Sequence, residues 1–257
     1  KGIFVGSGAG LPNFMNIPGE NALNIMSSNE YLTRVNLMDA ANPHSDTPIN
    51  LGKKVVVVGG GNTAMDTARA AKRNAGVEKV SLVYRRTRRY MPADEEELVM
   101  AIEDGVEFAE LLSPVRQENG VLICKKMVLG DIDASGRRGV VETDEIVEVP
   151  ADTVIAAVGE KVPSGFYEAN GIALDSRKRP QVNQDTLETS LKGVYAVGDG
   201  LFGPATVVEG IRDGKKAADT RIEQRTKLAK AITDNHKESN QFEGIFKKPV
   251  TLTGTIQ

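Results

Sequence analysis

The chain has few of the residues on which redox and hydrolytic centres commonly depend. Its 257 residues include a single cysteine, Cys124, and two histidines, His44 and His236. One cysteine excludes an intrachain disulfide, a CxxC redox centre and an all-cysteine iron–sulfur site within this chain. Both histidines stand in polar stretches, so we expect neither a zinc site nor a histidine-based triad. Cys124 ends the apolar run 121–124, which is typical of a small buried hydrophobic residue.

Long apolar runs and an excess of one charge are also missing. No run approaches the ~20 residues that span a bilayer, and no signal-peptide core is recognisable. The formal net charge of −3 offers no electrostatic reason to bind nucleic acid or an anionic membrane. We therefore expect a cytoplasmic protein with neither kind of partner. The 26 glycines cluster at turns, which favours close approach of the backbone to ligands.

Alternating strand and helix patterns predict an α/β fold. The predicted strands are 3–5, 55–58, 79–84, 152–158 and 194–197, and the predicted helices are 27–40, 64–74, 93–104 and 205–223. Three further segments, 106–112, 121–129 and 138–149, alternate with turns and predict an antiparallel meander. From about Thr226 the chain becomes polar and mixed, which indicates a helix end and a loosely held tail without an interpretable motif.

The strongest local motif follows the β-branched run 55–58. There the sequence reads G-x-G-x-x-A, with Gly59, Gly61 and Ala64 at the fixed positions, and a helical pattern comes next. The first glycine permits the tight turn, the second lets the backbone approach a pyrophosphate, and Ala64 allows close packing of helix and strand. A helix N-terminus attracts phosphate charge. The alternative is a structural βα turn that binds nothing.

The next strand ends in two arginines, Arg85 and Arg86, 21 and 22 residues after Ala64. NAD-binding units place a carboxylate near this point to bond the ribose 2′-hydroxyl. Paired guanidinium groups instead suit a 2′-phosphate, so the sequence favours NADP(H) over NAD(H). A solvated basic turn is the alternative, and it is the preferred interpretation of Arg88 and Arg89. The acidic residues at 94–97 disfavour a nucleic-acid patch.

Two other glycine segments need separate interpretation. Gly6–Gly10 follows a strand, but Pro12 and the run 13–19 leave no helix whose N-terminus could face a phosphate. We interpret it as a crossover between domains. Strand 194–197 delivers Gly198 and Asp199 to its carboxyl end, with another helix start behind it. A plain strand, turn and capped helix would look the same.

Taken together, these motifs resemble a known family. Residues 59–69, 82–87 and 91–93, and 193–199 followed by 203–209, are similar to the small (beta) subunit of NADPH-dependent glutamate synthase and related FAD/NAD(P)-dependent pyridine nucleotide oxidoreductases. The resemblance covers roughly residues 1–222. Relatives of this type include parts of dihydropyrimidine dehydrogenase and adrenodoxin reductase.

The resemblance implies a domain inserted into another. Residues 1–20 would form an FAD-domain edge and crossover, 21–160 an inserted Rossmann-like, three-layer NADP(H)-binding domain containing the meander, 161–223 the returning FAD-domain segment, and 224–257 a tail. The N-terminal FAD-binding unit would lie upstream of Lys1. We therefore expect an excised portion that binds FAD weakly or not at all and is inactive by itself.

The resemblance also implies roles for individual residues. Arg85 and Arg86 would hold the 2′-phosphate, Gly61, Asn62 and Thr63 the pyrophosphate, and Glu97 would approach the nicotinamide ribose. Asp199 would bond the flavin ribitol, and the backbone of Thr206 and Val207 would face the isoalloxazine ring. The remaining expected cofactor-binding residues belong to the glycine turns and the returning crossover: Gly59, Gly60, Ala64, Gly159 and Gly198.

The implied activity is hydride transfer from NADPH to FAD, with electrons passing to an iron–sulfur protein or a larger reductase or synthase subunit. Positioning dominates such a transfer, so no catalytic side chain is named. Two alternatives remain open. One is a non-catalytic nucleotide-binding module of a larger complex, and the other is an FAD-linked disulfide reductase, which would need a cysteine pair upstream.

Overall fold

The computed structural model describes residues 2–132 and 138–239. It divides into two compact units, which we call the inserted unit, Gly10–Lys161, and the outer unit, Lys1–Ala9 with Val162–Gln257. The inserted unit begins at Gly10 rather than at residue 21, because β2 (Leu11–Pro12) pairs antiparallel with β11 (Glu160–Lys161). The segments that leave and re-enter the outer unit are thus hydrogen-bonded to each other.

A five-stranded parallel sheet forms the centre of the inserted unit. Its order is β3 (Ile25–Ser27), β10 (Thr153–Ala156), β4 (Lys54–Val58), β5 (Lys79–Tyr84) and β6 (Glu107–Glu110). All four pairings are parallel. The order reverses beside β4: β5 and β6 follow on one side, while β10 and β3 lie on the other. Such a reversal opens a crevice at the carboxyl ends of the strands.

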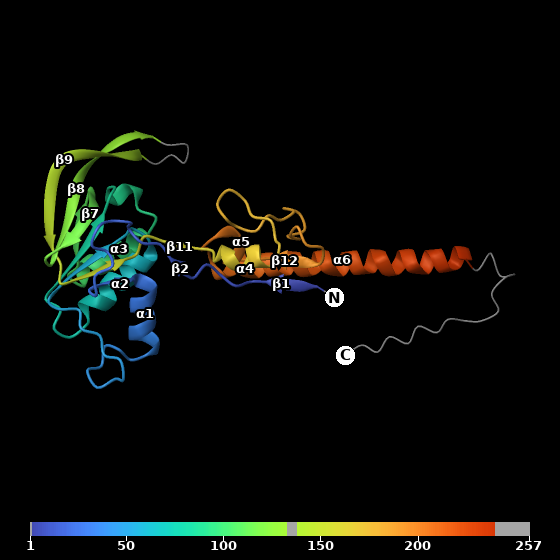
Figure 1. The fold of residues 1–257 in the computed structure, drawn as a ribbon, viewed down its shortest axis with the longest axis horizontal. Helices are drawn as coiled ribbons and strands as arrows, with labels where there is room; N and C mark the ends of the chain where they lie inside the picture. The colour runs from blue at the N-terminus through green and yellow to red at the C-terminus, as the bar shows by residue number, and fades with distance from the viewer. Residues whose placement is uncertain (1, 133–137, 240–257) are drawn as a thin grey trace. The chain divides into compact units, whose positions relative to one another are not determined.

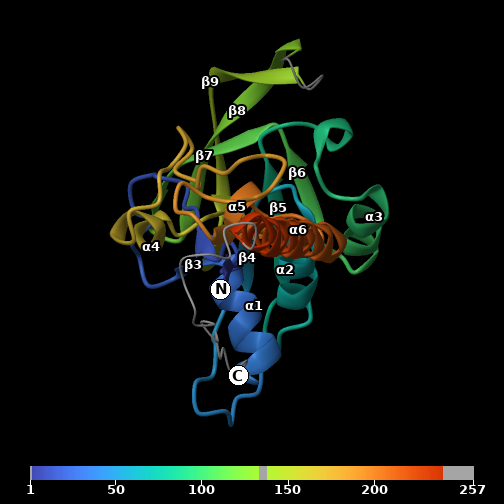
Figure 2. The ribbon, with the colours of Figure 1, turned by 90° about the vertical axis from the view of Figure 1, so that its right-hand side faces the viewer.

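Helices cover one face of this sheet and a second sheet covers the other. Alternate strand residues, including Val55, Val57 and Leu82, pack against α1 (Ser28–Leu37), α2 (Asn62–Lys72) and α3 (Glu95–Glu103). Their neighbours, including Val56, Val58 and Val83, pack against the antiparallel sheet of β7 (Leu112–Glu118), β8 (Val121–Ile132) and β9 (Arg138–Pro150). Figure 2 shows α1 and α2 on one side of the parallel strands and β7–β9 on the other. The predicted α/β, three-layer fold is confirmed.

Local signals explain several element boundaries. Ser27 caps α1, because its hydroxyl accepts a hydrogen bond from the Glu30 N–H at 3.1 Å.

Cys124 is fully buried between the two sheets, and this burial raises the pKa of its thiol to about 12. The expectation that Cys124 is a small buried hydrophobic residue is confirmed.

One predicted strand is placed wrongly. Residues 106–112, expected to open the meander, divide into β6 and the start of β7. Leu111 lies between them with φ of 58°, which breaks the strand. Helix α3 supplies the crossover that lets β6 pair parallel with β5, so β6 joins the central sheet. The meander proper is β7–β8–β9. Strand β3 at the sheet edge was not predicted.

The outer unit is built on two parallel strands and a long helix. Strand β1 (Ile3–Val5) pairs with β12 (Val194–Ala196), and α6 (Val207–Ser239) lies beside them (Figure 1). Tyr195 is fully buried there, and its hydroxyl donates to Gln224 of α6 at 2.7 Å. Two short helices were not predicted, α4 (Ser164–Ala169) and α5 (Asp199–Phe202).

Helix α6 is longer than the sequence pattern predicts. We expected an end near residue 223 and a loose tail, but the helix continues to Ser239. Its second half is rich in Lys, Arg, Glu and Ala, which are good helix formers although they lack an apolar pattern. Residues 240–257 of the expected tail lie outside the described residues.

Asp152 fastens the start of β10 to the start of β4. Its carboxylate accepts hydrogen bonds from the backbone N–H groups of Lys53 at 2.7 Å and Lys54 at 2.9 Å. The N–H groups of Lys54 and Lys53 lower the pKa of Asp152. Its contribution to the stability of the fold is therefore present above pH ~4 and is lost as the pH falls through the lowered pKa.

We expect Asp152→Ala to lower the unfolding free energy by about 1 kcal/mol at pH 7. This is less than the roughly 1.5–3 kcal/mol of a hydrogen bond to a charged group, because Asp152 is exposed. Urea denaturation of both proteins at pH 7 and pH 3 measures this. The difference should shrink at pH 3, and an equal difference at both pH values would contradict the assignment.

Candidate nucleotide-binding site

The carboxyl ends of β4, β5 and β10 open onto a cavity of about 640 Å³ within the inserted unit. The glycine turn 59–61 and Thr63 lie between two walls. One wall contains Arg85, Arg86 and residues 112–114, and the other contains residues 13–16 and 157–160. The cavity therefore lies where the strand order reverses, as expected for a ligand site of an open α/β sheet.

Each glycine of the turn meets a different constraint. A Cβ atom on Gly59 would collide with the carbonyl oxygen of Ala157, and one on Gly60 with the ring of Tyr84. At Gly61 a Cβ atom would meet nothing within 4 Å, and Gly61 faces the cavity. The first two glycines are thus needed for packing, while the third leaves space for a ligand.

The N-terminus of α2 is suited to an anion. Gly61 is its N-cap residue and supplies no side-chain cap, and the first turn contains no acidic residue. Unsatisfied N–H groups at a helix start attract phosphate. Thr63 lines the cavity, and Ala64, fully buried, packs in the core beneath it.

The arginines after β5 divide into two pairs. Arg88 lies 3.1 Å from Glu95, and the Arg89 guanidinium lies over the Tyr90 ring at 5.9 Å. Arg85 and Arg86 line the cavity, and neither forms an ion pair with any residue that the structure describes. The Nε of Arg86 donates to the carbonyl of Arg138 at 3.0 Å, and this hydrogen bond orients the guanidinium.

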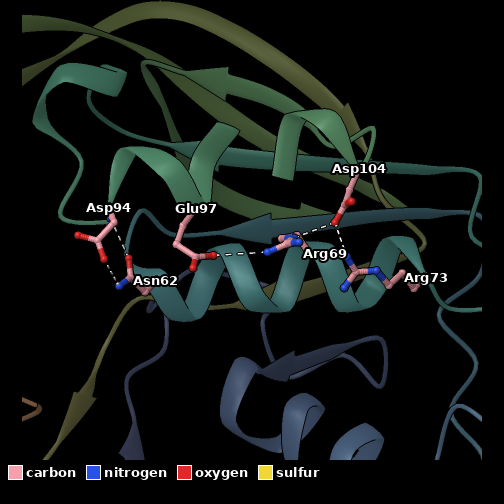
Figure 3. Close-up of polar contacts among 6 residues, drawn as sticks. All are labelled: Asn62, Arg69, Arg73, Asp94, Glu97 and Asp104. Atoms are coloured by element: carbon pink, nitrogen blue, oxygen red, sulfur yellow. Dashed lines mark hydrogen bonds and ion pairs between the residues drawn. The ribbon is translucent and has the colours of Figure 1, made fainter. Parts of the chain in front are cut away.

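The side chain of Asn62 is committed elsewhere. Its Nδ2 donates to Asp94 Oδ2 at 3.0 Å, and its Oδ1 accepts from the Asp94 N–H at 2.9 Å (Figure 3). Its backbone N–H and the second hydrogen of Nδ2 remain for the pyrophosphate role implied by the resemblance. Because the two residues are 32 positions apart, no sequence spacing indicated this pair.

Glu97 lies between α2 and α3 rather than among the residues that line the cavity. Its carboxylate is 3.5 Å from Arg69, and Asp104 accepts from Arg69 at 2.8 Å and Arg73 at 2.6 Å (Figure 3). The hydrogen bond from Arg69, with the charge of Arg73, lowers the pKa of Asp104. Glu97 is therefore not among the residues that line the cavity.

The cavity has one wall that sequence reasoning missed. The N–H of Asn13 donates to the carbonyl of Gly159 at 2.9 Å, and both residues line the cavity. Gly159 has φ of 97°, which favours glycine. Residues 13–16, with Phe14 and Met15, had been interpreted only as a loop. The sequence indicated Gly159 as a cofactor-binding residue, but it did not indicate that Asn13 lies beside Gly159.

The expected flavin-side residues gather around the first turn of α6 in the outer unit. Gly198, with φ of 61°, precedes Asp199 at the start of α5, and a Cβ atom on Gly198 would lie 3.7 Å from the Cα of Gly210. The hydroxyl and N–H of Thr206 both donate to Glu209 at 2.9 Å, and both bonds lower the pKa of Glu209. The Thr206 N–H is therefore used internally, and Val207 is 80% exposed.

Metal sites and membrane spans each require a particular arrangement of residues. Among the described residues, no group of three or more His, Cys, Asp or Glu side chains could hold a metal ion. None of the described helices has both the length and the apolar character needed to cross a membrane.

Comparison with known proteins identifies the family. The model of the pyridine nucleotide-disulphide oxidoreductases matches residues 1–214. The chain belongs to this family. It is 39% identical over 218 residues to the putative oxidoreductase YgfK of Escherichia coli K12, covering 84% of this chain and 20% of that protein. It is 35% identical over 233 residues to the glutamate synthase NADPH small chain of Azospirillum brasilense, covering 84% and 47%. The expected resemblance to glutamate synthase small chains is confirmed.

Solved structures of other proteins share the fold. FprA of Mycobacterium tuberculosis in complex with NADPH has a TM-score of 0.70 at 19% identity, covering 90% of this chain and 65% of that one. The thioredoxin reductase of T. acidophilum has a TM-score of 0.62 at 19% identity, covering 88% and 66%. The chain therefore spans between a fifth and about half of the two curated relatives, and about two thirds of these solved chains.

Proposed function

We propose that the inserted unit binds NADP(H) and serves as the nicotinamide-nucleotide part of an NADPH-dependent flavin oxidoreductase. The observation that carries the proposal is the cavity itself, which has a helix start without a side-chain cap at its centre. Arg85 and Arg86 lie on one wall and form no ion pair with the residues that the structure describes. A pyrophosphate and a 2′-phosphate of one nucleotide would meet these two features. The name of FprA in complex with NADPH agrees with this choice.

The cavity also suggests the direction of the nucleotide. With its pyrophosphate at the start of α2 and its 2′-phosphate at Arg85 and Arg86, the adenosine half lies on the β5 side. The nicotinamide half then extends toward β10, where residues 13–16 and 157–160 form the wall. Glu97 lies outside this cavity, so we assign it no contact with the nucleotide.

The outer unit fits the flavin part of such an enzyme. Gly198 and Gly210 leave no side chain between the end of β12 and α6, and Asp199 forms no ion pair with the described residues. Asp199 would bind a ribitol hydroxyl, and the start of α6 at Val207 would face the ring. Glu209 holds the first turn of α6 in place through Thr206. A bound FAD would supply a two-electron acceptor for the hydride of NADPH.

Relatives favour a multi-subunit setting. Besides the glutamate synthase small chain, they include the NADPH-Fe(3+) oxidoreductase subunit beta of Geobacter sulfurreducens, 40% identical over 209 residues, and the NADP(+)-dependent formate dehydrogenase subunit beta of Moorella thermoacetica, 40% identical over 173 residues. We therefore propose transfer of electrons to an iron–sulfur protein or a larger subunit. A non-catalytic nucleotide-binding module is the second candidate, and reduction of bound FAD by NADPH in the longer protein separates the two.

Titration of this chain with NADPH and NADH tests the nucleotide assignment. We expect NADPH to bind at least ~10-fold more tightly, since a charge-assisted hydrogen bond contributes about 1.5–3 kcal/mol and ~1.4 kcal/mol corresponds to a factor of ten. The preference should diminish as salt is raised, because Arg85 is exposed and Arg86 only half-buried. Equal affinity for the two nucleotides would overturn the proposal.

A further inference from the structure

Residues 85–94, which we call the basic loop, connect β5 to α3 and carry Arg85 and Arg86 at their start. The loop is hydrogen-bonded to its surroundings near its far end. The hydroxyl of Tyr84 donates to the carbonyl of Tyr90 at 2.9 Å, and the N–H of Ala93 donates to the carbonyl of Gly60 at 3.0 Å. The last part of the loop therefore lies against the glycine turn of the cavity.

The strongest link between the loop and the turn is the reciprocal pair of Asn62 and Asp94. Asn62 is the first residue of α2, and Asp94 is the N-cap residue of α3. The amide donates to the Asp94 carboxylate at 3.0 Å and accepts from its N–H at 2.9 Å, as Figure 3 shows. An asparagine can do both, because its side chain carries a donor and an acceptor. An aspartate at position 62 would set two carboxylates side by side.

We propose that Asn62 is a positioning residue for the 2′-phosphate site, acting through Asp94 and not through the nucleotide. The pair holds the end of the basic loop on the first turn of α2, and so keeps Arg85 and Arg86 in a fixed relation to the phosphate-facing helix start. This inference rests on the proposed binding of NADP(H). Without the pair, the end of the loop keeps only the Ala93–Gly60 and Tyr84–Tyr90 hydrogen bonds described above. Part of its ordering would then accompany nucleotide binding, and that ordering weakens affinity.

The position of the pair distinguishes this role from general packing of α2 on α3. At the far end of the same two helices, Asp104 accepts hydrogen bonds from Arg69 at 2.8 Å and Arg73 at 2.6 Å. The helices therefore remain joined when Asn62 is replaced. Asp104 is not among the residues that line the cavity, so Asp104→Ala is a matched control for lost helix–helix contacts.

The test compares the dissociation constants of NADP⁺ and NAD⁺ by calorimetry for Asn62→Ala, Asp94→Ala, the double variant and Asp104→Ala. For Asn62→Ala we expect NADP⁺ binding to weaken about 5- to 30-fold and NAD⁺ binding to change less than about threefold. Asp94→Ala should lose a similar amount of NADP⁺ affinity. The double variant should bind NADP⁺ no more weakly than either single variant, because the two residues act as one pair. Asp104→Ala should leave the ratio of the two constants unchanged.

Several results would overturn the inference. If the Asn62 side chain contacted the pyrophosphate directly, Asn62→Ala would weaken the binding of NADP⁺ and NAD⁺ equally. The losses of affinity in Asn62→Ala and Asp94→Ala would then add up in the double variant. If the wild-type chain prefers NADP⁺ and Asn62→Ala leaves the ratio of the two dissociation constants unchanged, the positioning role alone is refuted. If the wild-type chain shows no preference for NADP⁺ over NAD⁺, both the proposed function and the positioning role are refuted. If Asn62→Ala lowers the melting temperature strongly, Asn62→Ser, which retains a small polar residue at the helix start, replaces it in the comparison.

Discussion

Replacing Arg85 and Arg86 together by alanine is expected to weaken NADPH binding by about two to three orders of magnitude, with NADH binding nearly unchanged. Each guanidinium can form charge-assisted hydrogen bonds worth about 1.5–3 kcal/mol, and two contributions from the lower part of this range correspond to roughly 3–4 kcal/mol. The loss falls on NADPH because the 2′-phosphate is the only group that distinguishes the two nucleotides. Calorimetric titration of both nucleotides measures it.

The neighbouring arginines provide the control. Arg88 already pairs with Glu95 at 3.1 Å, and Arg88→Ala removes a similar charge from the same loop. We expect this variant to retain most of the preference for NADPH. If Arg88→Ala and the Arg85/Arg86 variant weakened NADPH binding equally, the arginines would act as a diffuse basic patch and not as a specific 2′-phosphate site. Unchanged NADPH affinity after loss of Arg85 and Arg86 would refute their assignment.

Gly61→Asp is expected to separate nucleotide binding from stability. Gly61 is the N-cap residue of α2, with φ of −97° and ψ of 173°, a conformation that aspartate adopts readily. A Cβ atom there meets nothing within 4 Å, and an aspartate N-cap favours the helix. The unfolding free energy should therefore stay constant or rise by up to ~1 kcal/mol. Nucleotide affinity should fall by more than about 100-fold, because the carboxylate occupies and repels the phosphate position.

Two companion variants complete this test. Gly61→Asn has nearly the same size and capping ability without the charge, so it separates repulsion from occupancy. Gly59→Ala places a Cβ atom against the carbonyl of Ala157, and we expect it to lower stability as well as affinity. Thermal unfolding and NADPH titration of all three variants give both quantities. Full affinity in Gly61→Asp would show that the pyrophosphate does not approach this helix start.

Much of the candidate site could be recognised because its signals are local. The turn at Gly59–Gly61 must follow a buried strand and open a helix, so a few adjacent residues carry the whole pattern. Arg85 and Arg86 stand at the end of the next strand, and parallel strands bring their carboxyl ends to one edge of a sheet. For the same reason, the strands at 55–58, 79–84 and 194–197 were placed correctly within a few residues.

Other features depend on partners far away in the chain. Whether residues 107–110 continue the meander or join the parallel sheet depends on pairing with β5, and their own alternation fits both arrangements. Asn62 belongs to a pair with Asp94 only because α3 begins beside α2. Residues 13–16 line the cavity because β2 pairs with β11 at the crossover.

The sequence by itself determined the chemistry of the nucleotide site, namely a glycine turn before a helix and two arginines where a carboxylate would favour NAD(H). Tertiary structure decided which of the surrounding polar residues take part. It placed Asn62 and Glu97 in contacts between α2 and α3, paired Arg88 with Glu95, and left Arg85 and Arg86 without a carboxylate partner among the described residues. The physical reason is that hydrogen bonds and ion pairs between separate elements follow from packing, which leaves no periodic signal in the sequence.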